Sequence, residues 1–310
     1  MGLLLGTARR AGPARLLPTT ASASGSDRVS APAAPLGRRL AAEAIGTGAL
    51  VAVVVGSGIQ ATRLSHDVGV QLLANSLATV FGLAVLITLL GPVSGAHFNP
   101  VVSLAVWITG RRTGGAAQLG EAVAYSAAQI LGAVGGAVVA NAMFAEPLVK
   151  WSAHERSAGH LWLGEIVATA GLVLLVLGLT RSGRDRLAPA AVASFIGAAY
   201  WFTSSTSFAN PAVTIGRAFT DTFAGIAPAS VGPFVAAQFV GAAVGLVLLA
   251  AVFGRTAPAA HASDAAHASD AAHASDAAHA SDVARSSDAA IPHPEHLPDA
   301  HPLPTTTSAR

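Results

Sequence analysis

Two short stretches decide how this chain folds, SGAHFNPVVSLA at 94–105 and SFANPAVTIG at 207–216. Each contains an asparagine followed by a proline, at Asn99 and at Asn210, and then an apolar run. Asparagine is a favoured helix cap, and proline suits the first helical turn because its missing N–H removes no hydrogen bond there. Both stretches therefore predict short helices that begin at the asparagine and are too short to cross a membrane.

The composition of the chain is typical of a membrane protein. Of its 310 residues, 52% are apolar and 11% are charged, whereas soluble domains carry about 25% charged residues. There is no cysteine, which excludes disulfides and thiolate metal sites. Six apolar runs approach the roughly 20 residues that a membrane-spanning helix needs, at 40–60, 70–92, 122–144, 161–179, 187–204 and 231–253. The short helices at 99–109 and 210–219 would then lie inside the protein or line a water-filled cavity.

The sequence repeats itself once, at low identity. A glutamate followed by threonine four residues later occurs in the first and fourth runs, at Glu43 and at Glu165, and an Ala-Ala-Gln-x-x-Gly pattern occurs in the third and sixth. Each unit has three spans, so the second unit must enter the membrane from the opposite side. This predicts an inverted repeat, with halves at about 38–145 and 160–254, whose special site lies near the membrane midplane.

The repeat also places ionisable groups inside apolar runs, which is costly and therefore points to a function. Glu43 and Glu165 could carry protons in a coupled transporter, or they could accept hydrogen bonds from the N–H groups of irregular loops. We favour the second interpretation, because the matching positions suggest one structural role used twice.

Small residues in the third and sixth runs allow close helix crossing. Gly132-x-x-x-Gly136 and Gly241-x-x-x-Gly245 both follow the Ala-Ala-Gln pattern, and such spacings let two backbones approach each other. The repeated pattern predicts that the third and sixth spans pack alike.

Basic residues predict the orientation of the chain in the membrane. They cluster at the two ends of the apolar region and in its second and fourth loops: Arg38, Arg39, Arg111, Arg112, Arg181, Arg184, Arg186 and Arg255. Because cytoplasmic loops are enriched in Lys and Arg, both termini are expected in the cytoplasm, which agrees with an even number of spans.

The two terminal regions have compositions that cannot bury a core. Residues 1–37 are rich in Ala, Pro, Ser and Arg and predict a disordered extension, although a targeting peptide has a similar composition. Residues 255–310 repeat HASDAA and predict a disordered tail, for which weak metal binding by the spaced histidines is the alternative.

The paired Asn-Pro stretches, framed by the two glutamate helices, resemble the aquaporin or major intrinsic protein family over about residues 38–254. The resemblance implies an all-α membrane fold with six transmembrane helices and two re-entrant half-helices, assembled as a homotetramer in the cell membrane. The residues that it implies for the pore boxes are Asn99, Pro100, Val101, Asn210, Pro211 and Ala212. It also implies that His97 lines the cytoplasmic vestibule and that Glu43 and Glu165 hold the re-entrant loops.

Such a pore needs no cofactor, metal or nucleotide, and nucleic acid is not an expected partner. The half-helices direct partial positive charge at the pore centre, and the asparagine amides can donate hydrogen bonds to a passing oxygen. Cations and protons are disfavoured, so the resemblance implies passive flow of small neutral solutes across the bilayer.

The chain departs from the family pattern at two positions. The first box has Val101 in place of alanine, and Val213 stands where water-selective and glycerol-conducting relatives have a filter arginine. Spacing suggests Ser207 and Ala198 as further filter positions. The second-helix position is Thr79 by ungapped counting, or Phe81 if the loop is two residues shorter than usual.

Arg217 complicates this filter. It follows Val213 by one helical turn, about 6 Å, and could either restore positive potential in the pore or point to the outer loops.

A wide, uncharged filter favours glycerol-like polyols, arsenite and organoarsenicals together with water, and the valine resembles a bacterial subgroup linked to arsenic resistance. A proton-coupled transporter, a water-selective aquaporin and a structural protein that Val101 has closed are the alternatives. A membrane enzyme is not expected, because no nucleophile and base are arranged together.

Overall fold

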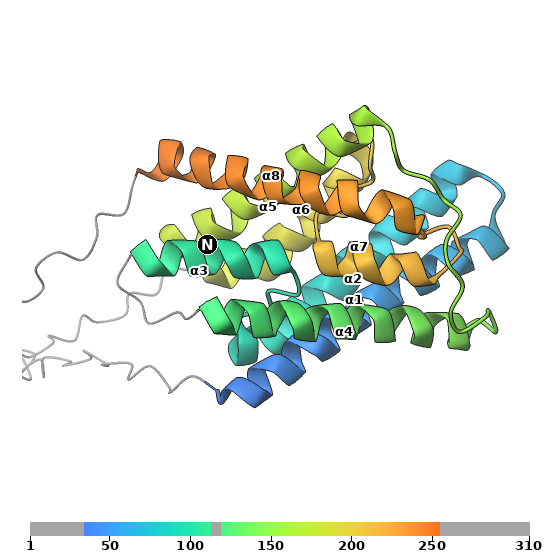
Figure 1. The fold of residues 1–310 in the computed structure, drawn as a ribbon, viewed down its shortest axis with the longest axis horizontal. Helices are drawn as coiled ribbons and strands as arrows, with labels where there is room; N and C mark the ends of the chain where they lie inside the picture. The colour runs from blue at the N-terminus through green and yellow to red at the C-terminus, as the bar shows by residue number, and fades with distance from the viewer. Residues whose placement is uncertain (1–33, 113–118, 255–310) are drawn as a thin grey trace, which may run out of the picture.

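The computed structural model describes residues 34–112 and 119–254 (Figure 1). Every regular element in this part of the chain is a helix. The α-helices are α1 (Leu36–Leu64), α2 (Val68–Ser94), α3 (Pro100–Arg112), α4 (Leu119–Met143), α5 (Gly159–Arg181), α6 (Ala188–Phe202), α7 (Pro211–Gly216) and α8 (Pro228–Phe253); the 3₁₀ turns are η1 (Asp185–Leu187) and η2 (Arg217–Phe219). The predicted extension, apart from residues 34–37, and the predicted tail lie outside the described residues.

Five of the described helices, α1, α2, α4, α5 and α8, are long and apolar enough to cross a membrane. The fifth run of the six-span prediction is shorter than expected, because α6 has 15 residues and a rise of 1.5 Å per residue makes it about 22 Å long. The turn η1 precedes α6, and the extended Thr203 ends it, which removes residues from both ends of the predicted span.

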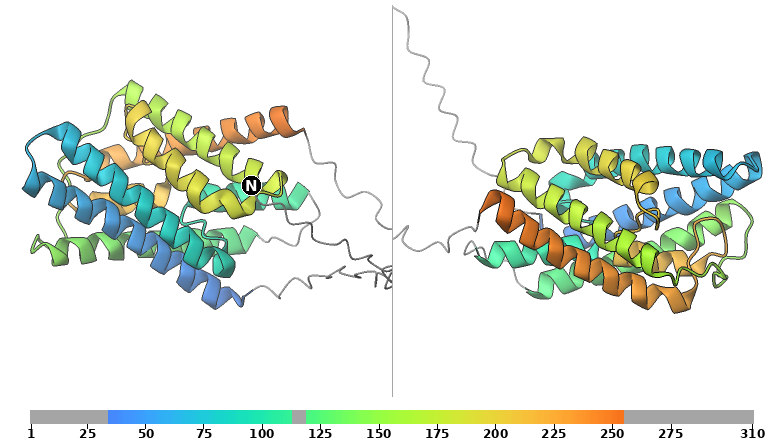
Figure 2. Two further views of the ribbon diagram at one scale, coloured as in Figure 1. Left: turned by 180° about the vertical axis from the view of Figure 1, so that it is seen from behind. Right: turned by 90° about the horizontal axis from the view of Figure 1, so that it is seen from above.

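The helices form a bundle in which the two halves of the repeat pack alike. α1 packs against α2 and α4, and α5 packs against α6 and α8 (Figure 2). A Cβ atom on Gly132 of α4 would lie 2.1 Å from the Ala44 carbonyl oxygen of α1, and one on Gly241 of α8 would lie 2.6 Å from the Ile166 oxygen of α5. Only glycine allows these approaches, which confirms that the third and sixth predicted spans, α4 and α8, pack alike.

The two short helices extend from the middle of the bundle toward opposite ends. α3 occupies one half of the long axis and α7 the other, as Figure 1 shows. α1 begins and α8 ends at the same end of the bundle, which we call the proximal end; the other is the distal end. The shared end agrees with an even number of crossings.

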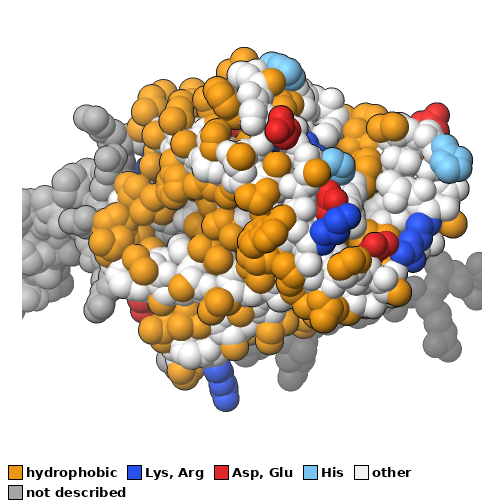
Figure 3. All heavy atoms as spheres, turned by 45° about the vertical axis from the view of Figure 1, so that its right-hand side comes forward, with side chains coloured by type: hydrophobic (Ala, Val, Ile, Leu, Met, Phe, Trp, Pro, Cys, Tyr) orange, Lys and Arg blue, Asp and Glu red, His pale blue; other side chains and the backbone are white. Residues whose placement is uncertain are grey.

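The outer surface of the bundle is mainly apolar. Hydrophobic side chains cover most of the face seen in Figure 3, and charged side chains and histidines gather mainly toward one part of it. Large apolar side chains such as Leu64 (76%) and Leu131 (74%) are exposed along the helices. Such a surface suits contact with lipid rather than water, and the chain is a multi-pass membrane protein.

Candidate pore

The residues before each short helix form two irregular loops that carry the same unusual backbone. Ala96 (φ 49°) and Phe98 (φ 49°) in the first loop match Ser207 (φ 51°) and Ala209 (φ 47°) in the second. Positive φ values are uncommon for residues with a side chain. They turn consecutive N–H groups away from the loop, so each loop needs an acceptor from elsewhere in the fold.

Glu43 of α1 is that acceptor for the first loop. Its side chain is fully buried. Its Oε1 accepts from the His97 N–H (3.0 Å) and from the hydroxyl of Ser94 (2.6 Å), and its Oε2 accepts from the Phe98 N–H (2.7 Å) and from Gln129 Nε2 (2.7 Å). The carboxylate is thus surrounded by four donors.

Glu165 of α5 does the same for the second loop. Its Oε1 accepts from the Phe208 N–H (2.9 Å), and its Oε2 accepts from the Ala209 N–H (2.8 Å) and from Gln238 Nε2 (2.6 Å). The two glutamines extend the match, because Gln129 also donates to Ser103 Oγ (3.0 Å) of α3 and Gln238 to Thr214 Oγ1 (2.9 Å) of α7. This geometry favours the loop-support role over a proton relay.

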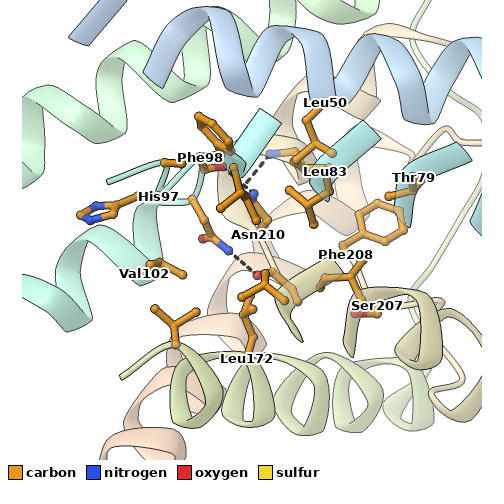
Figure 4. A pocket seen from close by; sticks show the side chains of 18 of the residues that line it. Leu50, Thr79, Leu83, His97, Phe98, Val102, Leu172, Ser207, Phe208 and Asn210 are labelled. Carbon is orange, nitrogen blue, oxygen red and sulfur yellow. Dashed lines mark hydrogen bonds between the residues drawn. The ribbon is translucent and has the colours of Figure 1, made fainter. Parts of the chain in front are cut away.

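The two asparagines tie the half-helices to each other where they meet. Asn210 Oδ1 accepts from the N–H groups of Ala212 (3.0 Å) and Val213 (3.2 Å), and Asn99 Oδ1 accepts from that of Val101 (3.1 Å). Asn99 Nδ2 donates to the Ala209 carbonyl (2.8 Å), and Asn210 Nδ2 donates to the Phe98 carbonyl (2.7 Å), as the dashed lines in Figure 4 mark. Each amide carries a second N–H, which leaves a donor for another oxygen.

A cavity of about 110 Å³ runs past both asparagines; we call it the central cavity. A single water molecule needs a cavity volume of about 10–15 Å³, so the central cavity can hold several small molecules. Its wall is mainly apolar, with Leu50, Leu83 and Leu172 among the side chains drawn in Figure 4. Its polar lining groups are few, and they include Thr79, Tyr200 and Ser207 toward the distal end.

A second, wider cavity of about 770 Å³ lies toward the proximal end; we call it the vestibule. It shares His97, Gly95, Ile87, Val176 and Ala188 with the central cavity. The two cavities therefore meet at His97, whose Nδ1 lies 3.0 Å from Ser103 Oγ. His97 therefore lies at the junction of the two cavities.

Three of the four predicted filter positions line the central cavity together. They are Thr79, Ser207 and Val213, and none of their side chains is more than 5% exposed. Phe81, the alternative to Thr79, is 67% exposed and faces outward. Thr79 Oγ1 lies 3.2 Å from the Tyr200 hydroxyl, so the second-helix position contacts α6 directly.

The prediction for Ala198 is corrected by the structure. Ala198 is exposed, while Val192, Ile196 and Tyr200 line the cavity at four-residue intervals. A residue two positions away from Tyr200 faces the opposite side of a helix. Counting back from Asn210 assumed a fixed loop length and therefore selected the outer face of α6.

Val101 does not lie where it could narrow the pore, as the closed structural protein would require. It is fully buried in an apolar cluster with Val173 of α5 and Leu249 of α8, and it does not line the central cavity. Val102, the next residue, lines it instead. The extra methyl groups of the first box are therefore packed against other helices.

Arg217 lines the central cavity and is 4% exposed. Its Nε donates to the Ala224 carbonyl, and its guanidinium carbon lies 3.4 Å from the centroid of the Phe208 ring. Arg217 therefore contacts the outer loop between η2 and α8 and also lines the central cavity, so each of the two alternatives holds in part.

Tyr200 and Val102 are two of the lining residues that the sequence analysis missed. Val102 follows Asn99 by three positions, as Val213 follows Asn210, so alignment of the two half-helices would have found it. Tyr200 had no comparable signal, because its position depends on the length and path of the loop before α7.

Comparison with known proteins agrees with this architecture. Residues 32–206 match the family described as Major intrinsic protein. The chain is 48% identical over 214 residues to Aquaglyceroporin AqpS from Rhizobium meliloti (strain 1021), covering 69% of this chain and 89% of that one. It is 32% identical over 240 residues to an Aquaporin Z from Brucella melitensis, covering 70% and 98%.

Among solved structures, the aquaglyceroporin from Plasmodium falciparum shares the fold, with a TM-score of 0.53 at 22% identity, covering 71% of this chain and 97% of the other. The repeat, the paired asparagine loops and these matches lead to one conclusion: the chain belongs to the major intrinsic protein family.

Proposed function

We propose that this chain is a passive channel for small uncharged solutes, with glycerol-like polyols and trivalent arsenic hydroxides, including organoarsenicals, passing as well as water. The observation that carries the proposal is the apolar side chain of Val213 in the wall of the central cavity. The relatives that resemble this chain include an aquaglyceroporin, which supports a channel for solutes such as glycerol and water.

The pore boxes provide the polar contact that a passing solute needs. Asn99 and Asn210 each use one amide hydrogen on the opposite loop, and the other hydrogen is free to be donated to a solute oxygen. The apolar wall around them offers no competing partner, so the contact is brief and the solute leaves as easily as it entered. Such a site binds weakly enough to conduct.

The filter consists of Thr79, Tyr200, Ser207 and Val213. Ser207 Oγ is buried without a hydrogen-bond partner in the described residues, so it can contact a solute. The Thr79 and Tyr200 hydroxyls lie 3.2 Å apart and can offer a further polar contact. Three hydroxyls and one apolar side chain suit a polyol or a neutral hydroxide, which presents oxygens on one side and an apolar surface on the other.

The competing functions fit the geometry less well. In a proton-coupled transporter Glu43 or Glu165 would exchange protons with the pore, yet their oxygens accept backbone and glutamine N–H groups. In a strict water channel we expect a narrow, charged filter. In a closed structural protein Val101 would block the path, but its side chain packs away from the cavity.

The proposal extends to the setting of the channel. We expect a homotetramer in the cell membrane with one pore in each subunit and with both termini in the cytoplasm. Arg38 and Arg39 at the start of α1 and Arg181, Arg184 and Arg186 around η1 support this orientation through the enrichment of basic residues on the cytoplasmic side.

Stopped-flow light scattering on proteoliposomes tests the proposal. Vesicles with the full chain should pass water, glycerol and arsenite faster than empty vesicles, and a pH gradient should leave the rates unchanged. Water flux alone would support the water-selective alternative. Solute flux that accelerates with the pH gradient would support the coupled transporter, and the absence of any flux would support the structural protein.

A further inference from the structure

We propose that Arg217 is the cation barrier of this pore, keeping protons and metal cations out of a filter that has no charge of its own. The inference rests on the proposed function in one respect, that the central cavity is the conducting path. It adds a specificity determinant at a position seven residues beyond the pore asparagine.

Among the described residues that line the central cavity, Arg217 is the only arginine or lysine. His97, at the junction with the vestibule, and Tyr200 are the other ionisable side chains among the described lining residues. Val106 follows Asn99 by the same seven positions and is uncharged. The positive charge therefore belongs to the distal half of the pore and has no counterpart in the proximal half.

Among the described residues, Arg217 forms no ion pair with a carboxylate. The ion pairs within residues 34–112 and 119–254 join Arg39 to Glu121, Arg63 to Glu146 and Lys150 to Asp221. The oxygens of Glu165 already accept from two backbone N–H groups and from Gln238. Among the described residues, the hydrogen bonds of Arg217 involve its Nε alone, so its remaining donors stay available to the cavity.

The guanidinium is held in place by the loop that forms the filter. It stacks on Phe208 at 3.4 Å, and the Phe208 N–H is fixed on Glu165. Phe208 also packs edge-to-face on Phe234 of α8, with ring centroids 5.3 Å apart. An arginine fixed in this way keeps its charge beside the path instead of moving into bulk water.

A second arginine strengthens the potential from outside the cavity. The guanidinium carbon of Arg156 lies 4.9 Å from the centroid of the same Phe208 ring, and its Nε donates to the Gly225 carbonyl (3.3 Å). Arg156 does not line the central cavity. The two arginines therefore differ in position, because Arg217 can contact a passing solute and Arg156 cannot.

The expected effect of one fixed charge is large. A unit charge about 6 Å from a passing cation, at an effective dielectric constant of about 20, lowers the cation flux on the order of 100-fold. A neutral polyol has no net charge and does not experience this barrier. Removing the charge should thus open a cation leak and change glycerol flux little.

The absence of cysteine from the chain makes a direct charge test possible. In Arg217→Cys the new thiol is the only one, and methanethiosulfonate reagents can add a cationic ethylammonium, an anionic sulfonatoethyl or a neutral methyl group. Proton entry is followed with a trapped pH dye under a fixed potassium diffusion potential, and glycerol flux is measured on the same vesicles. The wild type is the reagent control, and Arg156→Cys is the matched variant.

We expect Arg217→Cys to raise proton entry by more than tenfold. The cationic adduct should reverse this rise, whereas proton entry should stay high with the neutral and anionic adducts. Arg156→Cys should change proton entry less than threefold. If Arg217→Cys cannot be reconstituted, Arg217→Gln should leak and Arg217→Lys should not.

Proton entry that stays at the wild-type rate in Arg217→Cys or Arg217→Gln vesicles would overturn the proposal that Arg217 is the cation barrier. So would equal suppression of the leak by all three adducts, because that result indicates blockage by size. If the wild type shows no glycerol flux, the proposed channel function is contradicted instead. The proton measurement tests the role of Arg217 independently of that result.

Discussion

The loop before α3 and the loop before α7 have nearly the same hydrogen bonds and different side chains facing the cavity. In both, residues one and two positions before the asparagine donate their N–H groups to a buried glutamate. The side chain four positions after it, Ser103 or Thr214, accepts from a buried glutamine. The scaffold is thus used twice with little change.

The differences are confined to a few positions that meet the path or the helices around it. His97 in the first loop corresponds to Phe208 in the second, and Val106 in α3 corresponds to Arg217. Val102 and Val213 are the same residue at equivalent positions, and both line the central cavity. The comparison indicates that the shared positions hold the loops, whereas the differing positions give the two halves of the cavity different side chains.

Removing the buried carboxylates should have the largest effect. Glutamine in place of Glu43 supplies one carbonyl oxygen for four donors, and each unsatisfied buried donor costs about 1–3 kcal/mol. We expect Glu43→Gln to lower the free energy of unfolding by about 3 kcal/mol or more, and Glu165→Gln to lower it less because Glu165 has three donors. Thermal unfolding in detergent measures both.

Glu146→Gln is the control for that pair of variants. Glu146 forms an exposed ion pair with Arg63, and such pairs contribute about 0–1 kcal/mol. If Glu43→Gln were as stable as this control, the loops would not depend on their carboxylates.

The helix contacts should show the next largest effect and should differ between the halves. A Cβ atom would lie 2.1 Å from a backbone oxygen at Gly132 but 2.6 Å at Gly241. Overpacking costs about 1–3 kcal/mol, so Gly132→Ala should destabilise the protein more than Gly241→Ala. Gly135 has nothing within 4 Å of such an atom, and Gly135→Ala should be neutral or slightly stabilising. Equal loss in all three variants would contradict the close crossing.

The first box offers a test that separates packing from conduction. Val101→Ala removes two methyl groups from a buried cluster and should cost about 1–2 kcal/mol of stability. Because Val101 does not line the central cavity, glycerol and water flux through proteoliposomes should stay within about twofold of the wild type on this reasoning. A large gain in flux would mean that Val101 narrows the path after all.

The smallest expected effect concerns the outer loop that covers the distal half. Asp221 accepts from the Ala153 N–H (2.9 Å) and pairs with Lys150 (2.9 Å), and these contacts hold its pKa below the ordinary value. Their contribution is full above the ordinary pKa and is lost as the pH falls through the lowered one. Asp221→Asn should cost at most about 1 kcal/mol at pH 7.

The difference in unfolding temperature between wild type and Asp221→Asn should therefore shrink below about pH 4. A difference that persists unchanged at pH 3 would show that the aspartate acts through packing instead of charge.

Much of this architecture could be predicted from the sequence, for a physical reason. Helix caps and buried glutamates leave strong local signals, so the half-helices that begin after Asn99 and Asn210 and the roles of Glu43 and Glu165 follow from residue type and repetition. The glycine spacing likewise predicted the paired helix contacts, because no other residue permits such close backbones.

Positions that depend on loop length were harder to predict. The register of α6 relative to Asn210 is set by the path of residues 203–209, which have several positive φ values, and spacing alone selected Ala198 instead of Tyr200. The direction of the Arg217 side chain depends on the Ala224 carbonyl and the Phe208 ring. Neither contact is visible in a linear sequence.

The most direct test of the proposed wide, uncharged filter is the glycerol flux of Val213→Arg in proteoliposomes, measured beside wild type and the apolar control Val213→Leu. The longer arginine side chain should narrow the path, so that glycerol and arsenite flux fall about tenfold, which corresponds to a barrier raised by about 1.4 kcal/mol, while Val213→Leu stays within about threefold of wild type. Unchanged glycerol and arsenite flux in Val213→Arg, with the protein correctly reconstituted, would contradict the account.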